Sequence, residues 1–426
     1  MPDVTRTQTL AETRTPSPAT TDRTAEAAAS PRPWLTRLMI AGIVLAALNL
    51  RPAITSLGAL LEEARTGLHM SGSVAGVLTS VPPLCFALFG IAAPRLARRF
   101  GPGAVVCAGL AAIATGLLIR PFAGGTAGFL AASALALMGI AVSNVLMPVI
   151  VKRYFPDRVG SMTGLYSMAL ALGTSMAAAA TVPMTEALGG SWRAGLGIWA
   201  LPAVLAVLPW MALLRDRSAA ARSTPAARDQ QSPAPRITRS PTAWALGCFF
   251  GLQATGAYIT MGWMPQIFRD AGVPAGTAGV LLAVTMVMGV PLAFVIPRLA
   301  TRMKTQGPIV VALGLCGLTG YAGLFLAPAA GAWAWALLLG ISNCAFPLAL
   351  TMIGMRSRSG AGVVRLSAFA QSTGYLISIP GPLLVGVLYQ HSGGWGPPVA
   401  LMAGLIVPQI AVGILAGRDR TIEDEC

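Results

Sequence analysis

Twelve long apolar runs constrain this chain of 426 residues more than any other feature. Each run has about 20 residues with few or no charges, which is the length that crosses ~30 Å of hydrocarbon as a helix at ~1.5 Å per residue. Most connections between the runs are too short to hold a domain outside the membrane. The runs therefore predict an all-α integral membrane protein with twelve transmembrane helices, at 36–61, 73–94, 103–121, 126–150, 159–183, 193–214, 242–266, 275–297, 307–328, 331–354, 364–389 and 396–417.

The composition agrees with a membrane protein. Charged residues make up 11% of the chain and hydrophobic residues 55%, whereas soluble globular proteins carry about 25% charge. A water-soluble enzyme of ordinary composition is therefore excluded. The remaining charge is basic, with 30 Lys and Arg against 15 Asp and Glu, and in a soluble protein this excess would indicate a nucleic-acid partner.

The positions of the cations explain the excess in another way. If both termini are cytoplasmic, 25 of the 30 cations fall in cytoplasmic segments and four in outside loops, namely Arg65, Arg120, Arg193 and Arg269. Lys and Arg in short loops resist translocation and stay in the cytoplasm. The distribution predicts a multi-pass protein of the cytoplasmic membrane with both termini inside, and no nucleic-acid partner.

One cation, Arg51, remains, and it lies inside the first run. All fifteen acidic residues, by contrast, fall in tails, linker or loops, and so do both histidines. No carboxylate is therefore expected within the hydrocarbon region.

Two polar segments divide the chain. Residues 1–34 are rich in Thr, Ala, Pro and Arg without an apolar signal sequence, which predicts a disordered cytoplasmic tail. Residues 215–241 are rich in Ser, Ala, Pro, Gln and Arg, which predicts a cytoplasmic linker. The linker separates a six-helix bundle at 35–214 from a second at 242–417, and a short cytoplasmic tail follows at 418–426.

The two halves repeat short motifs in register. Ala-Gly-Val-Leu at 75–78 recurs at 278–281, and Pro-Arg-Leu-Ala at 94–97 recurs at 297–300, both at an offset of 203 residues. Asn-x-x-x-Pro at 144–148 also recurs, at 343–347. Such a register indicates an internal duplication. Two parallel six-span repeats joined by a polar linker are the organisation of a major facilitator transporter, whose substrate site lies between the halves near the bilayer midplane.

Segment 90–99, which reads Gly-Ile-Ala-Ala-Pro-Arg-Leu-Ala-Arg-Arg, resembles the loop signature of that superfamily, G-x-L-x-D-R-x-G-R-[KR]. The matching residues are Gly90, Arg95, Arg98 and Arg99, and the resemblance implies that they form a cytoplasmic gating loop. Pro94 replaces the acidic residue that helps to latch the inward-closed state in the family, so the usual gating network is incomplete here. Segment 48–56, Leu-Asn-Leu-Arg-Pro-Ala-Ile-Thr-Ser, resembles the branch of cyanate permeases and 2-nitroimidazole transporters.

Arg51 is the strongest candidate for substrate recognition. It follows Arg37 by 14 residues, so it lies roughly 20 Å into the bilayer, where an arginine costs at least ~2.5–3.5 kcal/mol. One interpretation is that it pairs with helix carbonyls or stabilises a kink at Pro52. The other is that it faces an aqueous cavity between the halves and takes its counter-charge from the substrate. Guanidinium binds planar oxygen groups with two parallel hydrogen bonds, so the substrate would be a small anion, a carboxylate or a nitro compound.

Polar side chains in other spans are further candidates to line this cavity. Helix-to-helix hydrogen bonding is an equally good explanation for each amide. These candidates are Asn49, Asn144, Tyr166, Gln253, Tyr258, Asn343, Gln371 and Tyr375.

The sequence thus predicts a secondary active transporter that moves a small anionic or electron-rich solute by alternating access. Efflux of nitroimidazole-like or other xenobiotic compounds is the open alternative. A membrane-embedded enzyme is a remote third, because the spans contain no acid or histidine that could activate a nucleophile. No nucleotide-binding loop and no Cys/His cluster is present, so we expect no cofactor, no metal and no catalytic residue. The expected partners are a small-molecule substrate and the lipid bilayer, and we expect a monomer.

Overall fold

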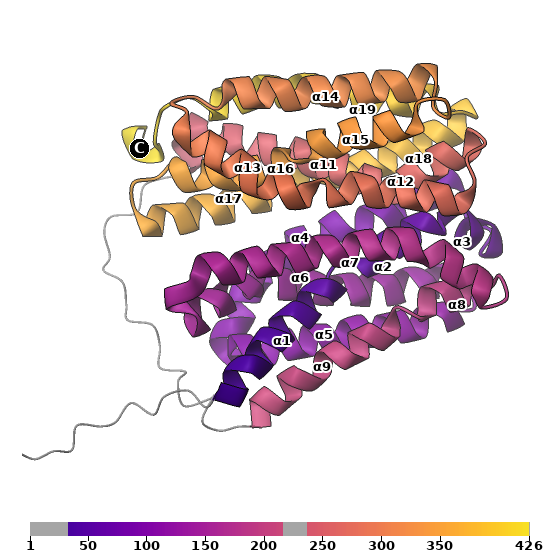
Figure 1. The fold of residues 1–426 in the computed structure, drawn as a ribbon, viewed down its shortest axis with the longest axis horizontal. Helices are drawn as coiled ribbons and strands as arrows, with labels where there is room; N and C mark the ends of the chain where they lie inside the picture. Colours follow the sequence, from indigo (N-terminus) through magenta and orange to yellow (C-terminus); the bar gives the residue numbers. More distant parts are fainter. Residues whose placement is uncertain (1–32, 216–236, 426) are drawn as a thin grey trace, which may run out of the picture.

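The computed structural model describes residues 33–215 and 237–425, and these residues form α-helices and short 3-10 turns without a strand. Figure 1 shows two layers, with the N-terminal half in indigo to magenta and the C-terminal half in orange to yellow. The predicted all-α fold is confirmed. The predicted tail at 1–34 and linker at 215–241 lie almost wholly outside the described residues.

In the N-terminal half, four of the predicted spans are single helices and the first and sixth are each broken into two. Two 3-10 turns, η1 (Arg120–Phe122) and η2 (Pro156–Arg158), connect helices of this half. The helices are α1 (Pro33–Asn49), α2 (Pro52–Ala59), α3 (Leu61–Gly67), α4 (Gly72–Phe100), α5 (Pro102–Ile119), α6 (Thr126–Tyr154), α7 (Val159–Ala187), α8 (Trp192–Gly197) and α9 (Ala200–Arg215).

The C-terminal half begins with the 3-10 turn η3 (Ile237–Arg239) and ends with η4 (Ile422–Asp424). Three of its spans are single helices and three are broken into two. The helices are α11 (Pro241–Asp270), α12 (Ala275–Val287), α13 (Gly289–Arg302), α14 (Gly307–Leu326), α15 (Ala332–Asn343), α16 (Ala345–Met355), α17 (Gly360–Ser378), α18 (Pro380–Ser392) and α19 (Gly396–Ala416).

Eleven helical segments among the described residues are long and apolar enough to cross a membrane, and they match eleven of the twelve predicted spans. The remaining span, 242–266, is α11. Its 30 residues are enough to cross a membrane, but polar side chains such as Gln253 and Gln266 reduce its mean hydropathy. Most of its residues are buried against other helices, so α11 needs less apolar surface than a helix that faces lipid.

The first span is interrupted beside Arg51. Helix α1 ends at Asn49 and α2 begins with Pro52; a proline at the first helical position lacks only an N–H that the helix would leave unbonded. Arg51 caps α2 with φ −127°, and its carbonyl oxygen accepts hydrogen bonds from the N–H groups of Ile54 and Thr55. Arg51 therefore lies on an unwound segment in the middle of the span.

Segment 90–99 is helical. The prediction of a loop here is wrong, because α4 continues to Phe100 and turns only at Gly101, whose φ of +83° is in the region that favours glycine. The cations Arg95, Arg98 and Arg99 lie exposed on the last turns of α4, where the helix dipole favours positive charge. The equivalent motif in the other half ends α13 at Arg302, so the repeated sequences end equivalent helices.

Several helix pairs join the halves, and the most extensive are α4 with α18 and α7 with α12. They involve the second and eleventh spans and the fifth and eighth spans, so the pairing follows the two-fold repeat. The backbones approach closely: a Cβ atom on Gly386 would lie 2.5 Å from the carbonyl oxygen of Gly72, and one on Gly279 would lie 2.5 Å from that of Ala178. Glycine permits this close packing between membrane helices.

Polar side chains also link the halves at the end of the molecule that carries α3, which we call the α3 end; the opposite end, with η4, is the η4 end (Figure 1). An ion pair joins Arg269 Nη2 to Glu63 Oε1 at 2.8 Å. Two hydrogen bonds accompany this ion pair: Ser73 Oγ donates to Gln390 Oε1 at 2.8 Å, and Trp263 Nε1 donates to Thr79 Oγ1 at 3.1 Å. The α3 end is therefore closed by contacts between the halves.

Candidate functional site

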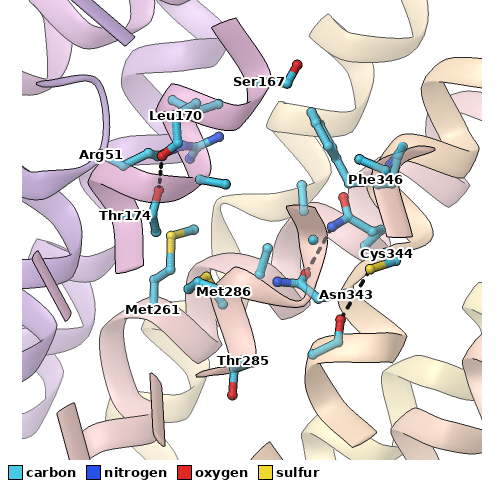
Figure 2. A pocket seen from close by; sticks show the side chains of 18 of the residues that line it. Arg51, Ser167, Leu170, Thr174, Met261, Thr285, Met286, Asn343, Cys344 and Phe346 are labelled. Atoms are coloured by element: carbon cyan, nitrogen blue, oxygen red, sulfur yellow. Dashed lines mark hydrogen bonds between the residues drawn. The ribbon is translucent and has the colours of Figure 1, made fainter. Parts of the chain in front are cut away.

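A cavity of about 210 Å³ lies between the two halves. Arg51 and one face of α7 form its wall on the N-terminal side, and α11 to α13 and α15 to α17 form the rest. Figure 2 shows Arg51, Leu170 and Thr174 facing Asn343, Cys344 and Phe346 across the cavity. Neither half encloses the site alone.

The lining residues follow helical spacing. On α7 they are three and four residues apart, which places them on one face; α11 contributes a longer stripe with the same spacing. The lining residues of these two helices are Ser167, Leu170, Ala171 and Thr174 on α7, and Phe250, Gln253, Ala254, Ala257, Tyr258 and Met261 on α11.

Arg51 is the one charged side chain among the residues that line the cavity. The side chains of Tyr258, Tyr375 and Tyr166 are the close polar neighbours of its guanidinium. Its Cζ also lies 5.9 Å from the centre of the Phe86 ring, within the range of a cation–π contact. No ion pair in the described part of the chain includes Arg51. The cavity therefore presents a positive charge that has no carboxylate partner.

Residues 38–382 match the profile of the Major Facilitator Superfamily. The chain belongs to this superfamily. It is 33% identical over 389 residues to the 2-nitroimidazole transporter of Escherichia coli (strain K12), covering 90% of this chain and 96% of the relative. It is 31% identical over 374 residues to the cyanate transport protein CynX of the same organism, covering 87% and 95%. The resemblance predicted from segments 48–56 and 90–99 is confirmed.

A solved major facilitator structure supports the same fold. The crystal structure of the nucleoside transporter NupG superimposes with a TM-score of 0.70 at 13% identity, covering 90% of this chain and 98% of that one. Identity at this level shows the fold alone. This facilitator is thus a multi-pass membrane protein with twelve spans in two pseudo-symmetric bundles, and its named relatives are transporters.

Five of the predicted site residues line the facilitator's cavity. They include a hydrogen-bonded pair, in which Gln253 Nε2 donates to Asn343 Oδ1 at 3.2 Å. The five are Arg51, Gln253, Tyr258, Asn343 and Tyr375.

Two other predicted residues form a second pair outside the lining of the cavity. The hydroxyl of Tyr166 donates to Asn144 Oδ1, and the same hydroxyl lies close to Arg51. The arrangement pairs Asn144 with a side chain of another helix, as Asn343 is paired in the other half. It places Tyr166 as a support for Arg51 rather than as part of the cavity wall.

Asn49 and Gln371 also lie outside the lining of the cavity. Asn49 is 3% exposed, and its Nδ2 donates to the carbonyl oxygens of Leu45 at 2.8 Å and Pro202 at 3.1 Å. It thereby joins the first span to the sixth. Gln371 Nε2 donates to the hydroxyl of Ser367 on the same helix at 2.7 Å.

The sequence interpretation missed several lining residues. Met286, Thr174, Ser167 and Phe346 also line the cavity. The helical spacing of 167, 170, 171 and 174 was visible in the sequence, but nothing there indicated that this face of α7 is the one turned to the other half.

Arg120, which the sequence analysis places in an outside loop, lies in the connection between α5 and α6 but is buried. It lies in η1 and is 1% exposed. Its Nη1 donates to the carbonyl oxygen of Ala53 at 3.1 Å, next to the break in the first span. The connection between α5 and α6 therefore folds inward and buries a second arginine in the N-terminal half.

Proposed function

We propose that this chain is a secondary transporter that moves a small anionic or electron-rich solute across the cytoplasmic membrane by alternating access. The observation that carries the proposal is Arg51, a cation on the wall of the central cavity with no carboxylate beside it. A desolvated charge without a partner is costly, so the solute is the natural source of the counter-charge. A guanidinium offers two parallel N–H donors to the two oxygens of a carboxylate or nitro group.

The rest of the cavity limits the size and shape of the solute. Its volume of about 210 Å³ is below the ~300–1,000 Å³ of typical drug sites. Phe250, Phe346 and Met261 give the wall apolar surface opposite the polar groups. Solutes with one charged or nitro group and a small planar body, or simple anions such as cyanate, fit this combination.

If the chain works by alternating access, its structure represents one state of the transport cycle. The α3 end is closed by the Arg269–Glu63 ion pair and the Ser73–Gln390 hydrogen bond, whereas Arg95, Arg98 and Arg99 at the η4 end are exposed. If the cations mark the cytoplasmic side, the η4 end and both termini are inside and the structure is closed to the outside. Transport then requires the contacts at the α3 end to break while new ones form at the η4 end.

Efflux of nitroimidazole-like compounds is the second candidate. It is supported by the relative named as a 2-nitroimidazole transporter, and because a nitro group presents the same planar pair of oxygens as a carboxylate, the same cavity suits either solute. The two candidates differ in direction. Cells that express the chain become less sensitive to 2-nitroimidazole if it exports the compound, and accumulate labelled cyanate or benzoate if it imports anions.

The proposed transporter works as a monomer without catalysis. One chain supplies every wall of the cavity, and the residues that line it include no acid or histidine. A single cation is enough to bind a solute, but not to activate a nucleophile.

Purified protein in liposomes tests the proposal. Uptake of labelled benzoate, cyanate, nitrate and 2-nitroimidazole is compared with that of benzamide, a neutral analogue of benzoate. The matched variants are Arg51→Gln and Arg193→Gln, because Arg193 is an exposed cation outside the cavity. We expect uptake of at least one solute of the anionic or nitro class, loss of that uptake in Arg51→Gln, and no change in Arg193→Gln. An uptake rate that depends neither on the charge of the solute nor on the Arg51 substitution would overturn the proposal.

A further inference from the structure

Arg120 has more hydrogen-bond donors than the fold uses. Of its five N–H donors, one on Nη1 is bonded to Ala53, and the Cζ atom lies 5.7 Å from the centre of the Phe129 ring. Its Nε and Nη2 atoms are fully buried and have no hydrogen-bond partner in the described structure. Burying a guanidinium with unused donors is costly, and one hydrogen bond to a carbonyl does not offset that cost.

A small cavity lies against this guanidinium. It has a volume of about 10 Å³, which is room for about one water molecule. Ser133 on α6 also lines it, is 1% exposed, and has a hydroxyl oxygen without a partner. Two groups suited to holding an anion, a guanidinium and a hydroxyl, therefore face one collapsed space.

The far side of this cavity belongs to the other half. Tyr258 and Gly262 of α11 close it, and they are held there by tight contacts: a Cβ atom on Gly262 would lie 2.8 Å from Thr79 Cγ2, and the neighbouring Trp263 donates to the Thr79 hydroxyl. When the halves part at the α3 end, α11 moves away from α4 and the cavity opens toward that end.

Tyr258 also connects the small cavity to the central one. It lines both, and its side chain is a close polar neighbour of Arg51. One residue of the other half, Tyr258, thus belongs to the wall of both cavities.

We propose that Arg120 and Ser133 form a second anion site, which binds the solute when the molecule is open at the α3 end and passes it to Arg51. The proposal rests on the proposed function in that the solute is an anion or carries a nitro group. The site is sealed in the closed state described here, so it serves the exchange with the outside and not the exchange with the cytoplasm.

Charged thiol reagents test the site without knowledge of the solute. Ser133→Cys places a thiol in the cavity, and two methanethiosulfonates are compared, one with an anionic sulfonatoethyl group and one with a cationic trimethylammonioethyl group. In each case the thiolate forms a disulfide with the reagent and methanesulfinate leaves. Labelling of the unsubstituted chain is subtracted, since it carries its own cysteines.

Arg120 should raise the rate at which the anionic reagent reacts. Relative to the ratio for a free thiol, we expect it to react with Ser133→Cys at least about fivefold faster than the cationic reagent. Adding Arg120→Gln should remove this preference, Arg120→Lys should keep most of it, and Arg193→Gln should leave it unchanged. No reaction at position 133, or a preference that survives Arg120→Gln, would overturn the proposal.

A transport measurement complements the labelling. Arg120→Gln should raise the KM for benzoate added at the α3 side and leave the KM at the η4 side unchanged, whereas a residue that only stabilises the fold would change both equally or lower the melting temperature. Arg120→Lys keeps the test valid if the Gln variant does not fold. Arg51→Gln should alter the reagent preference less than Arg120→Gln does. A reagent preference that does not depend on Arg120 would contradict this second site alone, whereas transport that does not depend on Arg51 would contradict the proposed function.

Discussion

Arg269 and Arg51 both lie where the two halves meet, but in opposite surroundings. Arg269, at the α3 end, has Glu63 of the other half at 2.8 Å. Arg51, in the central cavity, meets tyrosine hydroxyls and an aromatic ring. A cation that has its own counter-ion holds the halves together, whereas a cation without one is available to a ligand. A carboxylate partner beside the arginine therefore distinguishes a contact that closes the halves from a site that binds a ligand.

Substitution of Arg51 should have the largest effect. Removing one member of a buried, hydrogen-bonded charge pair costs 2 kcal/mol or more, which is at least about 30-fold, so transport of the preferred solute by Arg51→Gln should fall by this factor. Arg51→Lys keeps the charge but loses the planar pair of donors, and we expect an intermediate rate. Initial rates in liposomes measure both. If the Lys and Gln variants are equally active and both are close to the unsubstituted protein, Arg51 does not bind the solute.

The close packing at the α3 end should matter next. In Gly386→Val the new Cβ would lie 2.5 Å from the backbone oxygen of Gly72, which cannot move aside, so the closed state becomes strained. We expect transport to fall about tenfold, as is typical of overpacking that costs ~1–3 kcal/mol, and spin labels at the exposed positions 69 and 391 to move apart. Gly404→Val is the control, because no atom lies within 4 Å of its new Cβ. Equal behaviour of the two variants would show that closure does not depend on this contact.

The ion pair at the α3 end should contribute less. Arg269 and Glu63 are partly exposed, and such pairs contribute ~0.2–1 kcal/mol, so Arg269→Gln and Glu63→Gln should each shift the population of the closed state by up to about fivefold. The double variant should shift it no further. The same spin-label distance measures the populations. Glu62→Gln is the matched control, since Glu62 pairs with Arg65 within α3; if it shifts the population as much as Glu63→Gln, the effect is due to the net charge of α3 and not to the link between the halves.

The C-terminal tail lies away from both regions and should have the smallest effect on transport. Burial alone would raise the pKa of Glu425. Hydrogen bonds from Ser240 and Thr242 lower the pKa by more than burial raises it, so the pKa is below the ordinary 4.5. The stability that these hydrogen bonds give to the attached tail is fully present above pH 4.5. It is lost as the pH falls through the lower pKa of Glu425 in the folded state. Limited proteolysis of the tail should therefore increase in acid, and Glu425→Gln should expose the tail at neutral pH without changing the rate of transport. A slower transport rate in this variant would connect the tail to the cavity.

The sequence revealed the fold because its strongest signals are local. A run of 20 apolar residues and a cluster of arginines at its end need no knowledge of the partner helices, and the depth of Arg51 follows from counting residues along one span. The face that each helix turns to the cavity depends on distant contacts. Asn49 is as polar as Gln253, yet it bonds to the sixth span while Gln253 lines the cavity.

Arg120 illustrates the same limit at the edge of a span. Proline and glycine follow it in the sequence, which is typical of an exposed loop. Its burial arises because η1 packs against α5, α6 and α8, and its side chain reaches the broken first span, where the Ala53 carbonyl accepts a bond from it. Only the three-dimensional contact between these two segments identifies it as a second buried cation.

Binding of benzoate and benzamide to the purified protein tests the central claim most directly, because the two solutes differ in charge and hardly in shape. If Arg51 takes its counter-charge from the solute, benzoate raises the melting temperature of the unsubstituted protein, benzamide does not, and Arg51→Gln responds to neither. Equal stabilisation by both solutes, or a benzoate response that persists in Arg51→Gln, would contradict the account.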